Sequence, residues 1–546
     1  MFLRIMKSSG VIASALLFLF SVQVISGSRF KSLTFDEVSH IPAGYSYLVT
    51  GDYRMNFLHP PLTKYLAGLP LLFLNLPDPT TFVPWDSTDD FAFGKAFISA
   101  LGPRRDLVTA LSRAAMIVLA LMLGLGVFQW ATELWGPHQG LFALLLYALE
   151  PAIIAHTQLV TPDLGVTLFI FLSVYCLWRF SNLPSTKNLL LTGVALGCAL
   201  LSKLNALLLI GLVPALLYFF SDRTRISLVA RRVSMIFLVA FLTVWAGYGF
   251  ETGTVLHKKD IHATARAASE GLPQPAYRAL CSMAEEIAVP IPSYWRGLGQ
   301  LLYYARKEKR ESFWFGRHFR GGSLWGSMAA FCIKTPIPIL VFFVFALLFR
   351  RKRLLSKDQL FLLLPITAFF AMAPFHISLS LKFLLPVYPF VIVFASQLCD
   401  TRSLTGPRKA ILGALSLWLA IGTLAVYPNY LAYFNETIGG PKNGYMYLVD
   451  SNLDWGQDLP LLKDFLTGHG IKKIKLAYFG SADPVSYGIP YETLQPSSPT
   501  TGWIAVSATY LEGVHVAPNA YFWLKSFEPI EKIGYSIFVY NIKDIS

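Results

Sequence analysis

Long apolar windows recur along most of this 546-residue chain, and they constrain its fold more than any other feature. A helix needs about 20 mostly apolar residues to cross the ~30 Å hydrocarbon core of a bilayer. Windows of suitable length lie at residues 9–27, 107–132, 138–156, 162–180, 187–202, 204–220, 232–250, 325–349, 359–376, 381–399 and 409–427. The pattern predicts a polytopic α-helical membrane protein with about eleven transmembrane helices.

The composition favours the same class. Hydrophobic residues make up 54% of the chain, charged residues 14%, and the mean hydropathy is +0.51, which is too apolar for an ordinary soluble multidomain protein. The net charge of +14 could indicate nucleic acid, but Lys and Arg fall in short clusters between the windows. The cysteines show neither a disulfide framework nor paired metal-ligand spacing. We therefore expect membrane lipids as partners, and no nucleic acid.

The basic clusters also predict an orientation. With the N-terminus inside, the cytoplasmic loops carry Arg179, Lys187, Arg223, Arg225, Arg231, Arg232, Arg350, Arg351, Lys352, Arg353, Lys357, Arg402, Arg408 and Lys409, as the positive-inside rule requires. The first window also has the layout of a secretory signal peptide, but its removal would reverse every later loop. We expect an integral protein of the plasma (inner) membrane.

Three polar segments then lie outside: a first loop 28–106, a second loop 251–324 and a C-terminal tail 428–546. The chain accordingly divides into a transmembrane domain, 1–427, and an extracytoplasmic domain, 428–546. A helix-like run at 458–466 and strand-like runs at 474–479, 503–508 and 536–542 predict that the tail is a small α/β domain.

The first outer loop concentrates acids, cations and turn residues. Asp36, Glu37 and His40 precede Arg54, Asn56, His59 and Lys64 within thirty residues. A solvated loop with an interfacial helix would explain them, because carboxylates just outside a bilayer cost little. The alternative is a catalytic centre at the membrane face.

Two more charged residues lie at the expected outer ends of windows. Asp163 follows Thr161 and Pro162, which suit the N-cap and first position of a helix whose dipole favours the carboxylate. Lys203 lies alone between two apolar runs, against the charge bias. It is either a side chain that snorkels to the headgroups or a cation for a lipid phosphate.

The other outer segments leave alternatives open. His257, Asp260 and His262 allow a divalent metal as a possible cofactor, although their spacing fits no standard zinc template. The basic and aromatic stretch 303–320 predicts a helix on anionic headgroups, which could also guide a carrier lipid. In the tail, a cluster indicates either a sugar-binding surface or capping and packing; it comprises Asp450, Asp454, Trp455, Gln457 and Asp458.

The ordered motifs resemble the protein mannosyltransferase family, which also contains the bacterial lipid A aminoarabinose transferases and many polyprenyl-phosphate-dependent glycosyltransferases. They are Asp36-Glu37, Gly51-Asp52-Tyr53-Arg54-Met55-Asn56, His59-Pro60-Pro61-Leu62-Thr63-Lys64 and Thr161-Pro162-Asp163. The tail runs 427–436, 439–441 and 450–459 are similar to a block in uncharacterised bacterial members.

The resemblance implies a membrane glycosyltransferase of the GT-C type that takes a sugar from a polyprenyl-phosphate carrier on the outer face. Asp36 matches the family's catalytic acid, so it is the candidate base for the acceptor hydroxyl. Glu37 would orient Asp36 or the acceptor, or act in its place, and its like charge would raise the pKa of the pair. A single displacement with inversion is the expected course.

Cations should meet the charge of the leaving phosphate. The candidates are His59, Lys64, Lys203 and Arg54, although family relatives carry Lys where this chain has His59. The candidates for substrate binding are Asp163, His40, Asn56, Asp454 and Gln457. The acceptor would be a protein, lipid or glycan. The alternative function is a transporter or flippase of a lipid-linked sugar. The main feature in its favour is Lys334, which lies within an apolar window close to Pro336 and Pro338.

Overall fold

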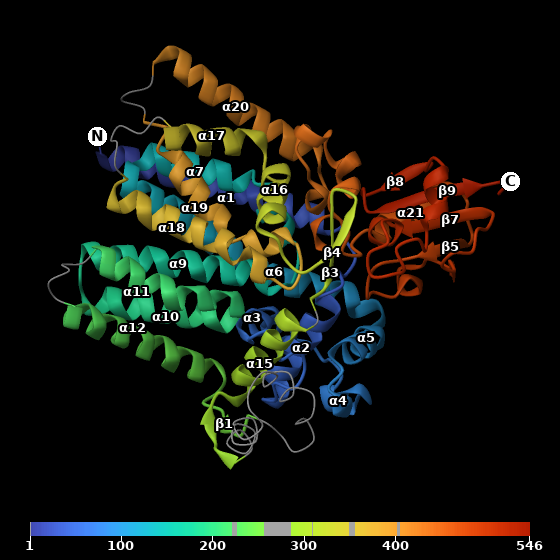
Figure 1. Ribbon diagram of the computed structural model, residues 1–546, viewed down its shortest axis with the longest axis horizontal. Helices are drawn as coiled ribbons and strands as arrows, with labels where there is room; N and C mark the ends of the chain where they lie inside the picture. Colours follow the sequence, from blue (N-terminus) through green and yellow to red (C-terminus); the bar gives the residue numbers. More distant parts are fainter. Residues whose placement is uncertain are drawn as a thin grey trace.

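A bundle of long helices makes up most of the computed structural model, which describes residues 2–220, 226–255, 286–307, 309–348, 355–400 and 405–545 (Figure 1). The bundle helices are α1 (Phe2–Ser28), α6 (Arg105–Trp135), α7 (Pro137–Ala148), α8 (Pro151–Thr157), α9 (Pro162–Asn182), α10 (Thr186–Ser202), α11 (Leu208–Phe220), α12 (Ile226–Gly247), α16 (Leu324–Lys334), α17 (Ile337–Leu348), α18 (Lys357–Met372), α19 (Val387–Ser396) and α20 (Gly406–Ala425).

Every predicted window coincides with helix in the described residues, and the protein is a multi-pass membrane protein. Six helices are long and apolar enough to cross a bilayer, or up to eight spans if two bent pairs each count as one. The pairs α7–α8 and α16–α17 bend by 63° and 113°, at breaks followed by prolines that lack the amide proton a helix needs. Because α10, α11 and α19 are shorter apolar helices, the count of eleven spans is not confirmed.

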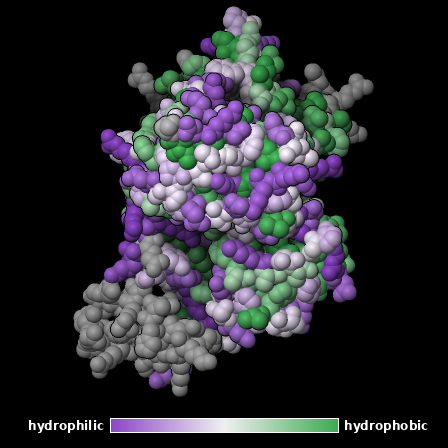
Figure 2. All heavy atoms as spheres, turned by 90° about the vertical axis from the view of Figure 1, so that its right-hand side faces the viewer, coloured by the Kyte–Doolittle hydropathy of each residue, from purple (hydrophilic) through white to green (hydrophobic). Residues whose placement is uncertain are grey.

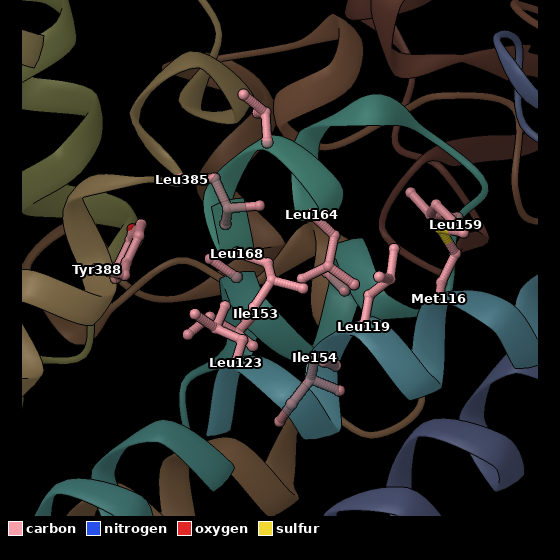
Figure 3. Packing of buried hydrophobic residues seen from close by; sticks show 14 of the residues in the cluster. Met116, Leu119, Leu123, Ile153, Ile154, Leu159, Leu164, Leu168, Leu385 and Tyr388 are labelled. Carbon is pink, nitrogen blue, oxygen red and sulfur yellow. The ribbon is translucent and has the colours of Figure 1, made fainter. Parts of the chain in front are cut away.

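Part of the core of the bundle lies around the N-terminal end of α9 (Figure 3). Figure 3 shows its side chains converging from α6, α8, α9 and the start of α19; they include Met116, Leu119, Leu123, Ile153, Ile154, Leu164, Leu168, Leu385 and Tyr388. Leu164 follows Asp163 directly, and Leu385 lies one turn after Lys382. The close packing therefore restricts the backbone at both charged residues.

The first outer loop folds into short helices at one end of the bundle (Figure 1). They are α2 (Glu37–Thr50), α3 (Leu62–Gly68), η1 (Leu69–Phe73), α4 (Pro84–Ser87) and α5 (Asp90–Ala100). Two close backbone approaches hold α2. A Cβ on Gly94 would collide with the carbonyl of Val38, and one on Gly44 with the carbonyl of Lys64. Glycine permits these contacts because it has no side chain.

The second outer segment contains α15 (Pro292–Arg306), a short antiparallel pair of β1 (Thr252–Gly253) with β2 (Val289–Pro290), and a hairpin of β3 (Glu311–Trp314) with β4 (Arg317–Arg320). The predicted interfacial helix over 303–320 is therefore wrong beyond Arg306. Phe315 and Gly316 both have positive φ, 50° and 75°, which is the geometry of a tight hairpin turn. His257, Asp260 and His262 lie outside the described residues.

The tail forms a mixed five-stranded sheet with α21 (Leu459–Gly468), as predicted for a small α/β unit. Its strand order is β6 (Tyr491–Thr493), β5 (Ile474–Ala477), β7 (Gly502–Ser507), β9 (Ile537–Ile542) and β8 (Glu531–Ile533). β5 is parallel to β6 and β7, while β9 is antiparallel to β7 and β8. The sheet lies at the same end of the bundle as the outer loops (Figure 1). Figure 2 faces this end and shows many hydrophilic residues on it. The domain boundary at residue 427 stays a prediction.

Candidate functional site

A cavity of about 700 Å³ opens between residues of the loop 28–106, α15 and the adjacent ends of the bundle helices. Six of the eleven predicted site residues line it: Asp36, His40, Asn56, His59, Asp163 and Lys203. Its apolar wall includes Leu207, Leu208, Leu298, Leu301, Leu302, Phe369, Met372, Phe375 and Phe383. The cavity thus combines charged and polar groups with apolar side chains of the kind that suits a hydrocarbon chain.

Asp36 is the N-cap residue of α2 and lines the cavity. Its Oδ2 lies 3.4 Å from the Nζ of Lys382, and the two side chains are 20% and 14% exposed. Lys382 was not among the predicted residues, although it is a lone Lys at the outer start of an apolar window. The same signal that identified Lys203 could have identified it.

Asp163 and Lys203 form a second ion pair on the cavity wall, with 2.5 Å between Oδ1 and Nζ. Thr161 is the N-cap of α9 and Pro162 its first residue, as predicted, although the Thr161 side chain makes no capping hydrogen bond. Lys203 lies between α10 and the short helix η4 (Leu204–Leu207). Both side chains are almost fully buried, so each neutralises the charge of the other.

Two histidines face the same cavity edge to face, with 5.6 Å between the ring centroids of His40 and His59. Burial lowers the pKa of His40 below its ordinary value. Burial, together with His40 and the nearby lysines, holds the pKa of His59 well below its ordinary value. Both rings are therefore neutral near pH 7, and His59 can offer a hydrogen bond but no positive charge.

Asn56 completes the polar wall through a small network with α2 and α5. Its Nδ2 donates to the Oγ of Ser39 at 2.9 Å and to the Oδ2 of Asp90 at 2.7 Å. The Ser39 hydroxyl donates to the same oxygen of Asp90 at 2.5 Å. Asn56 has a positive φ of 52°, a conformation that Asn tolerates better than most residues. Asp90, which also lines the cavity, was not predicted.

Glu37 is fully buried and is not among the residues that line the cavity. Both of its oxygens accept from the guanidinium of Arg113, at 2.9 and 2.7 Å, and the backbone N–H groups of Thr34 and Val160 donate to them as well. Burial alone would raise the pKa of Glu37, but Arg113 and these hydrogen bonds hold it below its ordinary value. The expected rise in the pKa of this member of the pair is therefore wrong, because Arg113 and the backbone hydrogen bonds together outweigh the effect of burial.

Lys64 and Arg54 do not line the cavity. The Nζ of Lys64 donates to the carbonyls of Asn56 and His59 at 2.6 and 2.7 Å and to the hydroxyl of Tyr47. Lys64 thus shapes the turn that carries His59. Arg54 pairs with Asp52 at 2.7 Å and lies over the ring of Trp85. A contact of either cation with a donor phosphate stays a prediction.

Asp454 and Gln457 are buried in the tail segment beside the cavity. The Nε2 of Gln457 donates to the carbonyl of Leu453 and to Asp458. Asp454 accepts from the N–H of Thr509 at 3.0 Å, and burial raises its pKa from 3.8 to about 7. These contacts match the packing alternative, and a role of either residue in substrate binding stays a prediction.

The same tail segment holds the loop that carries Asp36. The N–H groups of Ser32 and Phe35 donate to the carbonyls of Gln457 and Trp455, each at 2.9 Å. A buried ion pair of 2.5 Å joins Lys31 to Asp458.

The tail segment also holds the turn that carries Lys382. The Oδ1 of Asn452 accepts from the N–H of Leu381 at 2.8 Å, and the hydroxyls of Ser451 and Ser380 lie 2.9 Å apart. Residues 451–457 therefore fix both members of the Asp36–Lys382 pair.

No group of three or more His, Cys, Asp or Glu side chains within the described ranges could hold a metal ion. The histidines for which a metal was considered, His257 and His262, fall in the range 256–285, which is not described. A divalent metal therefore stays an untested alternative.

Comparison with known proteins supports the resemblance that the motifs indicate. The family described as dolichyl-phosphate-mannose-protein mannosyltransferase matches residues 106–246. Dolichyl-phosphate-mannose–protein mannosyltransferase 1 of Saccharomyces cerevisiae is 28% identical over 189 residues, which are 32% of this chain and 20% of that protein. The chain thus covers a fifth of the length of this relative. The resemblance is confirmed for a segment that contains Asp163 and Lys203.

Solved structures give weak global matches. The S. cerevisiae protein O-mannosyltransferase Pmt1-Pmt2 complex bound to the sugar donor has a TM-score of 0.31 at 22% identity, over 44% of this chain and 33% of that one. ArnT from Cupriavidus metallidurans bound to undecaprenyl phosphate has a TM-score of 0.32 at 13% identity, over 98% of each chain. Scores of this size do not support a residue-by-residue comparison.

Proposed function

We propose that this chain, whose residues 106–246 match the dolichyl-phosphate-mannose-protein mannosyltransferases, is a membrane glycosyltransferase that moves a sugar from a polyprenyl-phosphate carrier to an acceptor hydroxyl. One observation carries the proposal. The cavity of about 700 Å³ combines three carboxylates, five basic side chains and three histidines with many apolar side chains. A lipid-linked sugar needs both kinds of surface, one for its polar head and one for its hydrocarbon chain.

The chemistry assigns a role to Asp36. The acceptor oxygen attacks the anomeric carbon of the sugar, and the bond from this carbon to the phosphate oxygen breaks with its electron pair left on the phosphate. Asp36 takes the proton of the acceptor hydroxyl as a general base. It is the candidate because it lines the cavity with a partly exposed carboxylate, whereas Arg113 and backbone N–H groups occupy both oxygens of Glu37.

Positive charge is available where the leaving phosphate would gain charge. Lys203 and Lys382 line the cavity, and His59 can donate a hydrogen bond as a neutral ring. Preorganised donors of this kind usually supply the largest part of such catalysis. The grouping of loops and tail at one end of the bundle (Figure 1) fits an active site on the extracytoplasmic side, with a protein, lipid or glycan as acceptor.

The transporter alternative has less support from the contacts. Lys334 lies at the break between α16 and α17, as a coupling residue would. Its ammonium, however, donates to the carbonyls of Leu431 and Asn452, and the cavity beside it measures only about 10 Å³. Lys334 thus anchors the tail segment, and the space around it is too small for a sugar.

The test is consumption of radiolabelled polyprenyl-phosphate sugars by purified protein in lipid vesicles, with wild type and Asp36→Asn compared. We expect transfer or hydrolysis with one donor, and its loss in the variant while the carrier still binds. If no donor is consumed but labelled carrier crosses the bilayer equally in both proteins, the transferase proposal is wrong and the transporter alternative replaces it.

A further inference from the structure

The Asp163–Lys203 and Asp36–Lys382 ion pairs at the cavity differ in distance and in solvent exposure. Lys203 lies 2.5 Å from Asp163, and both side chains are at most 7% exposed. Lys382 lies 3.4 Å from Asp36, and both side chains are more exposed. An ion pair with a longer distance and greater solvent exposure has a smaller interaction energy. Lys382 is therefore the cation of the two that can leave its carboxylate at lower cost.

The turn that carries Lys382 is held in place, whereas its ammonium lies among aromatic rings. Asn452 and Ser451 hold its turn, while the ammonium lies 4.2 Å from the ring centroid of Trp455 and 6.0 Å from that of Phe383. The flexible stem of a lysine lets the charge sample several partners. The aromatic faces keep it attracted to the cavity while it moves.

The same contact affects Asp36. The Oδ2 of Asp36 accepts from the ammonium of Lys382 at 3.4 Å, so this oxygen is not free to accept from the hydroxyl of an acceptor. A base held in this way would act efficiently only after its cation had found another anion. The donor phosphate is such an anion, and it would enter the same cavity.

We infer that Lys382 binds the phosphate of the donor, and that its movement from Asp36 to this phosphate frees Asp36 to act as the base. The inference rests on the proposed function. In the resting state Lys382 neutralises Asp36; with donor bound it contacts a phosphate oxygen. It then stays in place as the bond from sugar to phosphate breaks and the charge on the phosphate grows. The enzyme thereby couples donor binding to activation of the base.

The experiment measures binding of a sugar-free polyprenyl phosphate to the purified full-length protein in nanodiscs, with the polyprenol of equal length as a phosphate-free control. Loss of a charge-assisted contact should weaken phosphate binding about tenfold or more in Lys382→Met, while Lys382→Arg restores most of it. Polyprenol binding should not change. Lys473→Met is the matched control, because Lys473 also forms a single ion pair, with Glu492, on the exposed surface of the tail.

A double-mutant cycle tests the exchange itself. Asp36→Asn should tighten polyprenyl phosphate binding several-fold, since Lys382 no longer has to leave a carboxylate, and this gain should disappear when Lys382→Met is added. A gain of equal size with Met at position 382 would mean general repulsion between Asp36 and the phosphate, and would overturn the exchange. Equal phosphate affinity in wild type and Lys382→Met would overturn the contact.

The two proposals fail in different ways. If the wild-type protein consumes a lipid-linked sugar but Lys382→Met binds the phosphate equally well, only the role of Lys382 is wrong. If the wild-type protein neither binds polyprenyl phosphate nor consumes any lipid-linked sugar, both proposals are wrong. A thermal melt of each variant verifies that it has folded, and Lys382→Arg keeps the test open should Lys382→Met not fold.

Discussion

The backbone N–H of Phe35 donates a 2.9 Å hydrogen bond to the carbonyl oxygen of Trp455, so the residue before Asp36 is held by a segment from the far end of the chain. The side chain of Trp455 also lies under Lys382. One tail residue thus contacts both sides of the ion pair at the cavity. The tail segment therefore helps to position the candidate base.

The adjacent acids Asp36 and Glu37 should respond differently to amide substitution. Removing one partner of a buried ion pair leaves the other charge uncompensated, so Glu37→Gln should destabilise the protein by about 3 kcal/mol or more through Arg113. Asp36→Asn should leave the melting temperature nearly unchanged and abolish turnover. Thermal unfolding in detergent and donor consumption measure the two effects. A stable but inactive Glu37→Gln would instead place Glu37 in the chemistry.

Asp454 should make the protein less stable as the pH rises. Because its folded pKa of about 7 lies above the ordinary 3.8, the folded state binds the proton more tightly than the unfolded state does between these values. The contribution of Asp454 to the free energy of unfolding is fully present below pH 3.8. It falls by about 1.4 kcal/mol per pH unit until the pH reaches the folded pKa, and does not change further above it. Asp454→Asn should remove this part of the pH dependence, as seen in melting temperatures at about pH 5 and pH 8.

The contact between the β3–β4 hairpin and the tail should depend on pH with an optimum. Burial would lower the pKa of His515, but its hydrogen bond to Asp450 raises it above 6.5. Burial would raise the pKa of Asp450, but His515 holds it below 3.8. The stabilisation that His515 contributes is fully present below pH 6.5 and is lost as the pH rises through its raised pKa. The stabilisation that Asp450 contributes is present above pH 3.8 and is lost as the pH falls through its lowered pKa.

Limited proteolysis of this hairpin across pH tests the prediction, because the N–H of His515 also donates to Glu311 on β3. Protection should be greatest between the two transitions. In His515→Gln, protection from proteolysis should no longer decrease on the alkaline side of the optimum, while the cavity beside Asp36 is unaffected. An unchanged profile in this variant would show that other groups cause the pH dependence.

Gly94 should tolerate no side chain. A Cβ at this position would overlap the carbonyl of Val38 on α2, and α2 begins at the residue after Asp36. Gly94→Ala should therefore lower both melting temperature and turnover. Gly10→Ala is the control, since a Cβ there meets nothing within 4 Å, and Ala in place of a helical Gly favours the helix by up to about 1 kcal/mol. Equal behaviour of the two variants would contradict the close approach of α5 to α2.

The sequence by itself determined the elements that local composition controls. Apolar windows predicted the bundle helices, because a span needs a run of apolar residues whatever its neighbours are. Strand-like runs between Gly and Pro residues predicted β5, β7 and β9, and the predicted run at 458–466 became α21. The stretch that ends at Arg320 was mistaken for helix, because a hairpin turn at Phe315 and Gly316 depends on two backbone angles rather than on periodicity.

Only the tertiary structure decided which charged residues share a cavity and which neutralise each other. Asp36 and Glu37 are neighbours in sequence, yet one faces Lys382 and the other Arg113, because successive positions at a helix start point in different directions. Lys382 reaches the site from a segment far along the chain, and Asn452 and Ser451 hold the turn that carries it. Burial and partner choice are set by distant packing, which no local pattern encodes.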